Sequence, residues 1–151
     1  MNHHFTAPWG RKLTLVTGAL LAVLAWAAVA AGGVGSAGIV VVVVACAAFS
    51  VRGYSVVGGQ LLVHRLGWVT RFDLGRLQSA EFSPGAMLGS LRTFGNGGLF
   101  AFTGHFRNAA IGSYRAFATD SARTVVLDFG SERVVVTPDR PAEFVAALDL
   151  R

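Results

Sequence analysis

The side chains best suited to chemistry lie in and just after a glycine- and phenylalanine-rich segment, residues 89–112. No aspartate or glutamate occurs between Glu81 and Asp120, whereas arginines recur there. A guanidinium group makes forked hydrogen bonds with phosphate or carboxylate, and glycines let consecutive backbone N–H groups line an anion-binding concavity. The segment therefore predicts a contact surface for an anionic lipid or another anionic ligand, formed by Arg92, Asn96, Gly97, Gly98, Arg107 and Arg115.

The same segment has two other interpretations. Asn96-Gly97 is a common tight-turn pair, and glycines with aromatic residues often do no more than shape and pack a loop. A contact surface for a partner protein is the third interpretation. The sequence alone leaves open whether residues 89–112 form a binding loop or only packing.

Aromatic residues accompany the basic ones. Rings on a loop beside basic residues suit insertion at the level of the lipid headgroups. We therefore expect a membrane-interface group formed by Trp9, Phe94, Phe100 and Phe102.

Signatures of catalysis and of metal or cofactor binding are missing. The histidines His3, His4, His64 and His105 lack metal-ligand spacing, and no Walker A or GxGxxG pattern occurs. The single cysteine, Cys46, cannot form an intramolecular disulfide or a cysteine-based zinc site. We expect no enzymatic activity, no metal and no cofactor, unless catalytic groups far apart in the sequence meet in space.

The charge balance also argues against nucleic acid as a partner. Of 13 basic residues, Arg11 and Lys12 precede the long apolar stretch, which leaves 11 basic against 8 acidic residues for the rest of the chain. That excess is modest for a nucleic-acid-binding surface.

The elements that must position these residues begin with an uncharged stretch. From Leu13 to Val51 the chain has no Asp, Glu, Lys, Arg or His, which at this length indicates lipid surroundings. One helix would be nearly twice too long for a bilayer, and a glycine cluster at residues 32–38 breaks the stretch. The N-terminal part, residues 1–51, therefore predicts a transmembrane hairpin with helices at about 13–31 and 34–51.

A cleaved secretory signal is the alternative for the first helix. Arg11-Lys12 forms a basic start, and Ala28-Val29-Ala30 matches a cleavage pattern. The apolar core is longer than that of a typical signal, and a second apolar segment follows at once. Whether the segment is cleaved stays open.

Basic residues flank both outer ends of the hairpin. Arg11 and Lys12 precede it, Arg52 and Arg65 follow it, and its tip has none. The positive-inside rule then predicts a multi-pass protein of the inner or plasma membrane, with the N-terminus and the following domain in the cytoplasm.

Residues 52–151 show the short alternating segments of a β-rich domain. Strands are expected at 54–57, 61–66, 68–74, 114–119, 124–129 and 133–137. Pro141 and Glu143 suit the first turn of a final helix, in which Phe144, Ala147 and Leu148 share one face. An antiparallel sheet closed at one end by this helix is the expected fold.

Three stretches carry a family resemblance: YSVVGGQLLVHRLGWVTRFDL, SLRTFGNGGLFAFTGHFRNAAIGSYRAFATD and VVLDFGSERVVVTPDRPAEFVAAL. In their order and in the final helix they resemble a bacterial pleckstrin-homology-like (PH-like) domain. The resemblance implies a bent antiparallel β-sandwich or barrel capped by its C-terminal helix, and no catalysis. The lysine-based lipid-binding signature of the wider PH family is absent, because this domain has no lysine.

Two functions are consistent with these features. The first is a membrane-anchored binding or scaffold module whose domain contacts lipid headgroups or a membrane-protein partner at the cytoplasmic face. The second is an accessory or assembly subunit of a larger transport or envelope complex, with no lipid recognition of its own. Small residues spaced four apart on the helices motivate the second. The identity of ligand or partner and the oligomeric state, homo-oligomer included, stay open.

Overall fold

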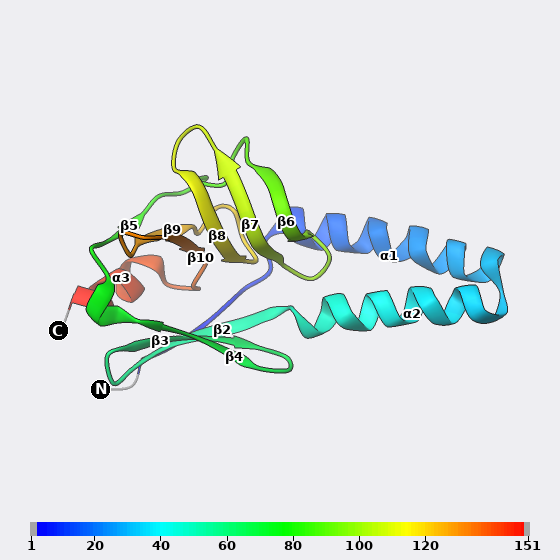
Figure 1. Cartoon of the computed structure of the whole chain (residues 1–151), viewed down its shortest axis with the longest axis horizontal. Helices are drawn as coiled ribbons and strands as arrows, with labels where there is room; N and C mark the ends of the chain where they lie inside the picture. The colour runs from blue at the N-terminus through cyan, green and yellow to red at the C-terminus, as the bar shows by residue number, and fades with distance from the viewer. Residues whose placement is uncertain (1–2, 150–151) are drawn as a thin grey trace.

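The computed structural model describes residues 3–149, which form a mainly β domain with two projecting helices (Figure 1). A mainly β domain with a C-terminal helix confirms the predicted class. In chain order the elements are β1 (His3–Thr6), α1 (Arg11–Ala31), α2 (Gly33–Ala48), β2 (Val51–Val57), β3 (Gln60–Arg65), β4 (Val69–Asp73), the 3-10 turn η1 (Leu74–Arg76), β5 (Ser79–Phe82), β6 (Leu91–Gly97), β7 (Phe102–Asn108), β8 (Gly112–Ala118), β9 (Val125–Asp128), β10 (Arg133–Val136) and α3 (Pro141–Asp149).

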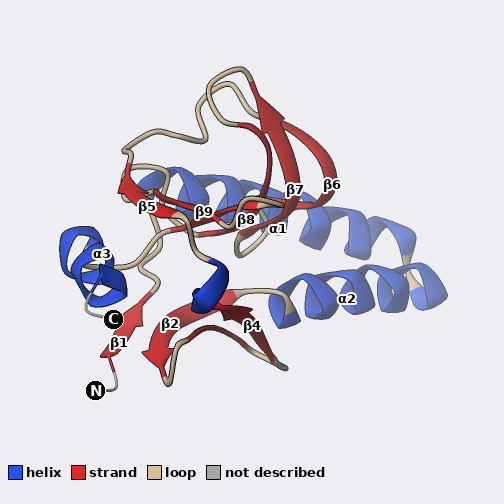
Figure 2. Cartoon of the chain, turned by 60° about the vertical axis from the view of Figure 1, so that its left-hand side comes forward, coloured by secondary structure: helices blue, strands red, loops and turns tan. Residues whose placement is uncertain are grey.

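The two long helices are an insertion between paired strands. β1 and β2 are antiparallel neighbours, with Phe5 opposite Tyr54 and Thr6 opposite Gly53. A Cβ at Gly53 would lie 2.7 Å from the carbonyl oxygen of Phe5, so only glycine permits this approach. The helices lie side by side and are joined at Gly32, whose φ is 59° (Figures 1 and 2). Both ends of the helix pair therefore return to the same β domain.

The strands form two sheets whose facing sides enclose the main core. Their orders are β1-β2-β3-β4 and β5-β9-β10-β8-β7-β6, and β8 and β10 form a parallel pair. Alternate side chains of each strand point inwards; Leu61 and Val63 of β3 are fully buried against residues such as Leu127 and Val134 of the other sheet. Two facing sheets fit the sandwich that the family resemblance implied. The pairing is not wholly antiparallel, because β9 and β10 return beside β8 and β10 runs parallel to it.

α3 closes one end of the sandwich (Figure 2). Its buried side chains are Phe144, Ala147 and Leu148, the face that the sequence predicted. Phe144 packs edge-to-face on Phe5 of β1, with ring centroids 5.1 Å apart. The N-terminal strand and the C-terminal helix thus complete the same core.

The β6–β7 hairpin bends sharply at a pair of glycines. Gly95 and Gly104 lie opposite each other, with φ values of 113° and 129°. A Cβ on Gly95 would collide with the backbone of Thr103 and Gly104, and one on Gly104 would collide with the backbone of Phe94. This close approach requires glycine at both positions.

The structure corrects the predicted elements in several places. α2 begins at Gly33 and ends at Ala48, whereas 34–51 was expected, because Val51 already pairs with Arg65 in the sheet. Most of residues 89–112 form strands β6 and β7 instead of one long loop. β1 and β5 were not anticipated.

The shortened second helix bears on the membrane prediction. Among residues 3–149, α1 is the helix long and apolar enough to span a membrane, while α2 is apolar but has 16 residues. By length and composition the chain therefore has one candidate span, where the sequence predicted two.

Candidate functional site

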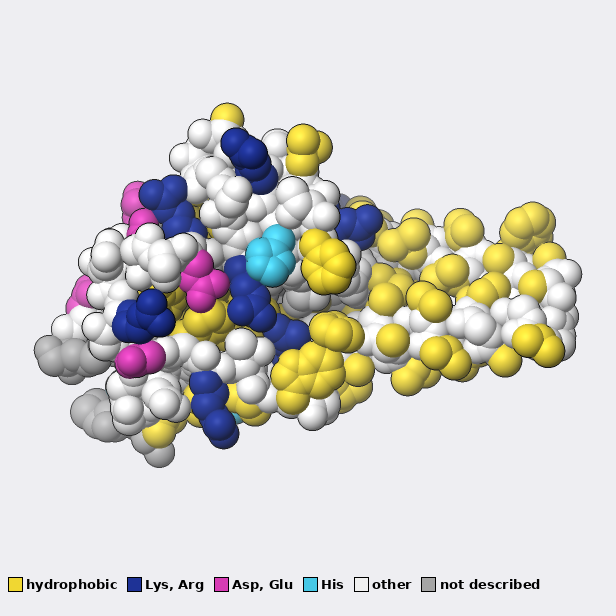
Figure 3. Space-filling view, viewed as in Figure 1, with side chains coloured by type: hydrophobic (Ala, Val, Ile, Leu, Met, Phe, Trp, Pro, Cys, Tyr) yellow, Lys and Arg dark blue, Asp and Glu magenta, His cyan; other side chains and the backbone are white. Residues whose placement is uncertain are grey.

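A cleft opens between the two sheets, beside the domain end of α2. Figure 3 shows Lys or Arg side chains and a histidine in this region, with hydrophobic side chains next to them. The cleft has a volume of about 460 Å³. Among the described residues that line it there is no aspartate or glutamate, and the basic ones are Arg65, Arg92, His105 and Arg115.

Arg65 enters the cleft from the end of β3. It follows Val63 in the inward-facing phase of the strand, and its guanidinium lies over three rings: Phe117 at 4.7 Å, Trp68 at 5.3 Å and Phe49 at 5.8 Å from the ring centroids. Its Nε is buried and has no hydrogen-bond partner among residues 3–149. An unmet buried donor typically costs about 1–3 kcal/mol. Arg65 is thus held against aromatic rings, and its Nε–H group has no partner in the described part of the chain.

Arg115 reaches the same cleft from β8. Its guanidinium lies 5.0 Å from the ring centroid of Phe117 and 6.0 Å from that of Phe72. Within residues 3–149 the ion pairs involve other arginines, so neither Arg65 nor Arg115 forms one, although Arg115 also borders a separate hollow lined by Asp73 and Glu132. Burial, and then repulsion by Arg115, lowers the pKa of Arg65 to about 10. Two neighbouring cations without a counterion are an arrangement suited to binding an anion.

The side of the cleft nearest α2 is apolar. Ala45 and Cys46 of α2 line it, together with Phe49, which follows the helix. Phe49 packs edge-to-face on Trp68, with centroids 4.7 Å apart, and both rings are partly exposed, at 43% and 42%. The basic groups therefore lie directly behind an apolar margin that continues along the helix.

The residues predicted to contact an anion are only partly brought together. Arg92, Asn96 and Arg115 line the cleft. Arg107 is exposed on β7 and does not line this cleft. It lies next to Asn108, whose amide bonds the Ala86 carbonyl at the strand end opposite the β6–β7 turn.

The β6–β7 turn, which includes Gly97 and Gly98, docks on α1. The Asn96 side chain closes the turn by donating to the Leu99 carbonyl and accepting from its N–H, at 2.5 and 3.1 Å. Thr17 Oγ1 of α1 donates to the Gly98 carbonyl at 2.9 Å and accepts from the Phe100 N–H at 3.1 Å. The turn therefore fastens the sandwich to the helix pair.

The four aromatic residues predicted at the interface have different surroundings. Trp9 and Phe100 are neighbours, with centroids 6.1 Å apart, beside the start of α1. Phe94 lines the cleft and is 76% exposed. Phe102 packs against the buried cluster of Phe106, Tyr114, Ala116 and Val135 on the outer face of the sheet.

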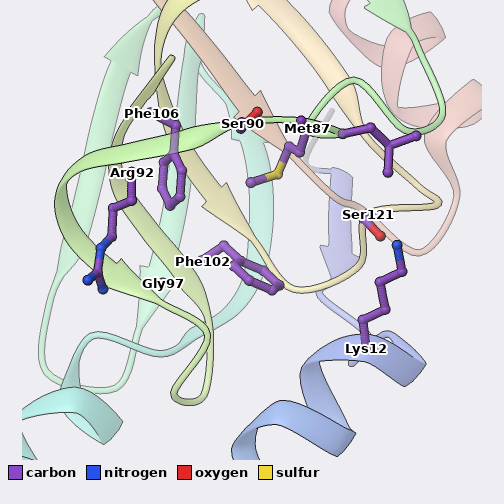
Figure 4. Close-up of a pocket in the computed structure, with 10 residues that line it drawn as sticks. Lys12, Met87, Ser90, Arg92, Gly97, Phe102, Phe106 and Ser121 are labelled. Carbon is purple, nitrogen blue, oxygen red and sulfur yellow. The ribbon is translucent and has the colours of Figure 1, made fainter. Parts of the chain in front are cut away.

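A second hollow, of about 400 Å³, lies against this outer face. Figure 4 shows Lys12 extending from α1 towards Ser121 on one side, while Arg92 lies on the other side near Gly97. The two cations do not converge there, unlike those of the cleft. Within residues 3–149, no group of three or more His, Cys, Asp or Glu side chains is placed to hold a metal ion.

Sequence reasoning missed Arg65 as a site residue, although a signal for it existed. Arg65 follows Val63 at a spacing of two, and Arg115 precedes Phe117 at the same spacing, so both arginines lie in the inward phase of their strands. A charged residue in that phase at a strand end is a candidate site residue. The contribution of α2 had no comparable signal.

With the fold and the cleft established, comparison with known proteins identifies the class. Residues 52–151 match the bacterial PH domain family. The match covers most of the chain, and the chain belongs to this family. No curated protein and no solved structure matches.

Proposed function

We propose that this protein is a membrane-anchored binding module, in which the helix pair inserts into the bilayer and the PH-like domain contacts anionic lipid headgroups at the cytoplasmic face. The observation that carries the proposal is the acid-free cleft of Arg65, Arg92 and Arg115 at the foot of two apolar helices. The family membership supports a binding or scaffold role.

The exposed apolar surface of the helices supports insertion. In α2 no residue is buried, and in α1 only Leu13 and Thr17 are, both near the domain. At 1.5 Å per residue, α1 is about 32 Å long and α2 about 24 Å, against a bilayer core of about 30 Å. A short second helix can be accommodated by local thinning of the bilayer. Together the two helices form a multi-pass hairpin in this proposal.

The β1–β2 pairing supports the proposed orientation. Since β1 precedes the helices and β2 follows them in one sheet, both ends of the pair lie on the same side of the membrane. Arg11 and Lys12 at one end, and Arg52 and Arg65 at the other, favour the cytoplasmic side. Cleavage after the first helix would remove Phe5 from the core, which favours an uncleaved chain.

The energetics of tethering suit headgroup contact. Each basic residue close to an anionic membrane surface contributes about 1 kcal/mol of attraction. Because the helices already hold the domain at the surface, weak contacts suffice for occupancy through a high effective concentration.

Topology labelling and alkaline extraction test this proposal. In a Cys46→Ala background, single cysteines are placed at Val34, 91% exposed near the tip, and at the exposed Ser131 of the domain. Intact cells are then treated with a membrane-impermeant maleimide. We expect labelling of the tip but not of the domain, and retention of the protein in the membrane after carbonate washing. Release by carbonate would refute anchoring, and domain labelling in intact cells would refute the cytoplasmic orientation.

The assembly-subunit function remains a second candidate. Gly18 and Ala22 are exposed on α1, and a Cβ at Gly18 would meet no atom within 4 Å. Such a small-residue surface permits close approach of another transmembrane helix. Crosslinking from cysteines at these positions would capture a partner helix or a second copy if this function holds, and would give monomer alone if it does not.

A further inference from the structure

We propose that the cleft holds the phosphate of an intact anionic glycerophospholipid, taken up sideways from the bilayer, with its acyl chains lying along α2. This inference rests on the proposed membrane insertion and adds to it a defined site, a ligand class and a direction of entry.

The charge of the cleft selects an anion. Arg65 and Arg115 approach from opposite sheets over the shared ring of Phe117, and neither forms an ion pair with a described carboxylate. The buried Nε of Arg65 has no partner in the described chain. A phosphate bound by the two guanidinium groups would accept forked hydrogen bonds and offset the repulsion between them. Arg92 adds a third cation at the margin of the same cleft.

The polarity gradient of the cleft selects an amphiphile over a soluble anion. The wall towards the helices consists of Ala45, Cys46 and Phe49, and Phe94 lies on the β6 side. Val41 and Val42 of α2, four residues before Ala45 and Cys46 on the same helix face, are 66% and 53% exposed and extend the apolar surface away from the domain. A glycerophospholipid matches this sequence of surfaces, because its phosphate and its chains are joined through a short glycerol. Inorganic phosphate would leave the apolar wall without a partner.

Native mass spectrometry of the full-length protein tests the site. The protein is purified in a neutral detergent and mixed with dioleoyl phosphatidic acid, dioleoyl phosphatidylcholine or soluble glycerol 3-phosphate. We expect retention of phosphatidic acid at least about tenfold above phosphatidylcholine, equivalent to about 1.4 kcal/mol. We also expect that glycerol 3-phosphate at about 1 mM, a concentration at which even weak ligands bind, does not displace phosphatidic acid.

Matched variants locate the bound lipid. Arg65→Gln combined with Arg115→Gln should reduce retention of phosphatidic acid to the level of phosphatidylcholine. Arg71→Gln combined with Arg107→Gln, which removes the same two charges at exposed positions outside the cleft, should not. Arg65→Lys with Arg115→Lys retains the charges and should restore part of the binding. Thermal unfolding of each variant identifies any loss of fold. If the double glutamine variant is unfolded, a second measurement uses the chain with Trp9→Phe and Trp26→Phe, in which Trp68 is the remaining tryptophan. Phosphatidic acid with brominated acyl chains should then quench the fluorescence of Trp68.

The outcomes separate this inference from the proposed function. Equal lipid retention by the wild type and a folded Arg65→Gln, Arg115→Gln variant would overturn the site, as would an equal loss in the Arg71→Gln, Arg107→Gln control. Displacement by glycerol 3-phosphate would overturn the intact-lipid ligand in favour of a soluble phosphate. Absence of lipid binding by a carbonate-resistant protein would also overturn the inference while leaving membrane anchoring intact.

Discussion

Tyr54 of β2 links the two sheets through its side-chain hydroxyl group. Its fully buried hydroxyl donates to the Phe117 carbonyl at 2.5 Å and accepts from the Thr137 N–H at 3.1 Å. Tyr54→Phe removes both buried hydrogen bonds, so we expect the free energy of unfolding to fall by about 1–3 kcal/mol. Urea denaturation measures this loss. Tyr114→Phe is the control, because its hydroxyl contacts the partly buried Ser90 hydroxyl and should cost less; equal losses would contradict the assigned role of Tyr54.

His64 makes the stability of β1 and its neighbours depend on pH. Ser55 Oγ lies 2.9 Å from His4 Nδ1 and 2.8 Å from His64 Nε2, and the two rings are 5.8 Å apart. Burial, and then the charge of His4, lowers the pKa of His64 in the folded protein. Above the unfolded pKa of about 6.5 both states are neutral at this position. As the pH falls below it, the unfolded state takes up the proton first, so stability decreases.

We therefore expect the melting temperature of the wild type to drop between about pH 7 and pH 5, on either side of the ordinary histidine pKa. His64→Gln, which keeps a hydrogen-bonding group near Ser55, should show a smaller drop. His105→Gln removes a histidine outside this group and should behave as the wild type does. Parallel pH profiles of wild type and His64→Gln would show that His64 does not contribute.

Among the elements, the β6–β7 hairpin depends most on two positions that have no side chain. Gly95 and Gly104 face each other with positive φ, and a Cβ on either meets the opposite backbone. Gly104→Ala should therefore cost more than the roughly 1 kcal/mol of an unfavourable alanine backbone alone. Chemical denaturation of Gly104→Ala and of Gly67→Ala tests this, because a Cβ at Gly67 meets nothing within 4 Å. A nearly neutral Gly104→Ala would contradict the close approach.

The same hairpin shows where prediction from sequence succeeds and fails for elements. Strands with regular alternation and few glycines, such as those around Leu61 and Val134, were anticipated, as was the apolar face of α3. β6 and β7 were interpreted as a loop, since their glycines weaken strand propensity and only tertiary pairing restores it. β1 pairs with β2, a strand far along the chain, and its Phe5 lies opposite Tyr54, 49 positions later. Nothing local in the sequence indicates that pairing.

The candidate site was predictable to a similar extent. Arg92 and Arg115 were selected because they stand in an acid-free, glycine-rich stretch, and both line the cleft. Arg107 was selected by the same reasoning and lies elsewhere, because composition does not specify which end of a strand a residue occupies. Arg65 was missed because a single basic residue after a hairpin was interpreted as a topological signal only. The convergence of β3, β8 and α2 is a tertiary property.

At the scale of the molecule, the helix pair and the sandwich are connected in three ways. The chain passes from β1 into α1 and from α2 into β2, two strands that pair with each other. The Gly10 N–H donates to the Thr119 carbonyl just before α1 begins. Further along α1, the Thr17 hydroxyl donates to the Gly98 carbonyl in the β6–β7 turn. A domain held at both ends and braced at a third point keeps its cleft at a fixed position relative to the helix pair.

This architecture predicts that the sandwich is independent of its helices but not of β1. Replacing residues 11–48 with a flexible linker of about six residues, which can span roughly 20 Å, should yield a folded protein that stays in solution without detergent.

The fragment 52–151, which corresponds to the family match, lacks β1 and with it Phe5, 3% exposed in the core. Its free energy of unfolding should be at least about 3 kcal/mol lower than that of the linker variant, the usual cost of removing a buried phenylalanine. Urea denaturation of both proteins measures the difference, and Phe5→Ala in the linker variant should reproduce most of it. Equal stability of the fragment and the linker variant would show that β1 is dispensable and that the two ends of the helix pair are not held together by the sheet.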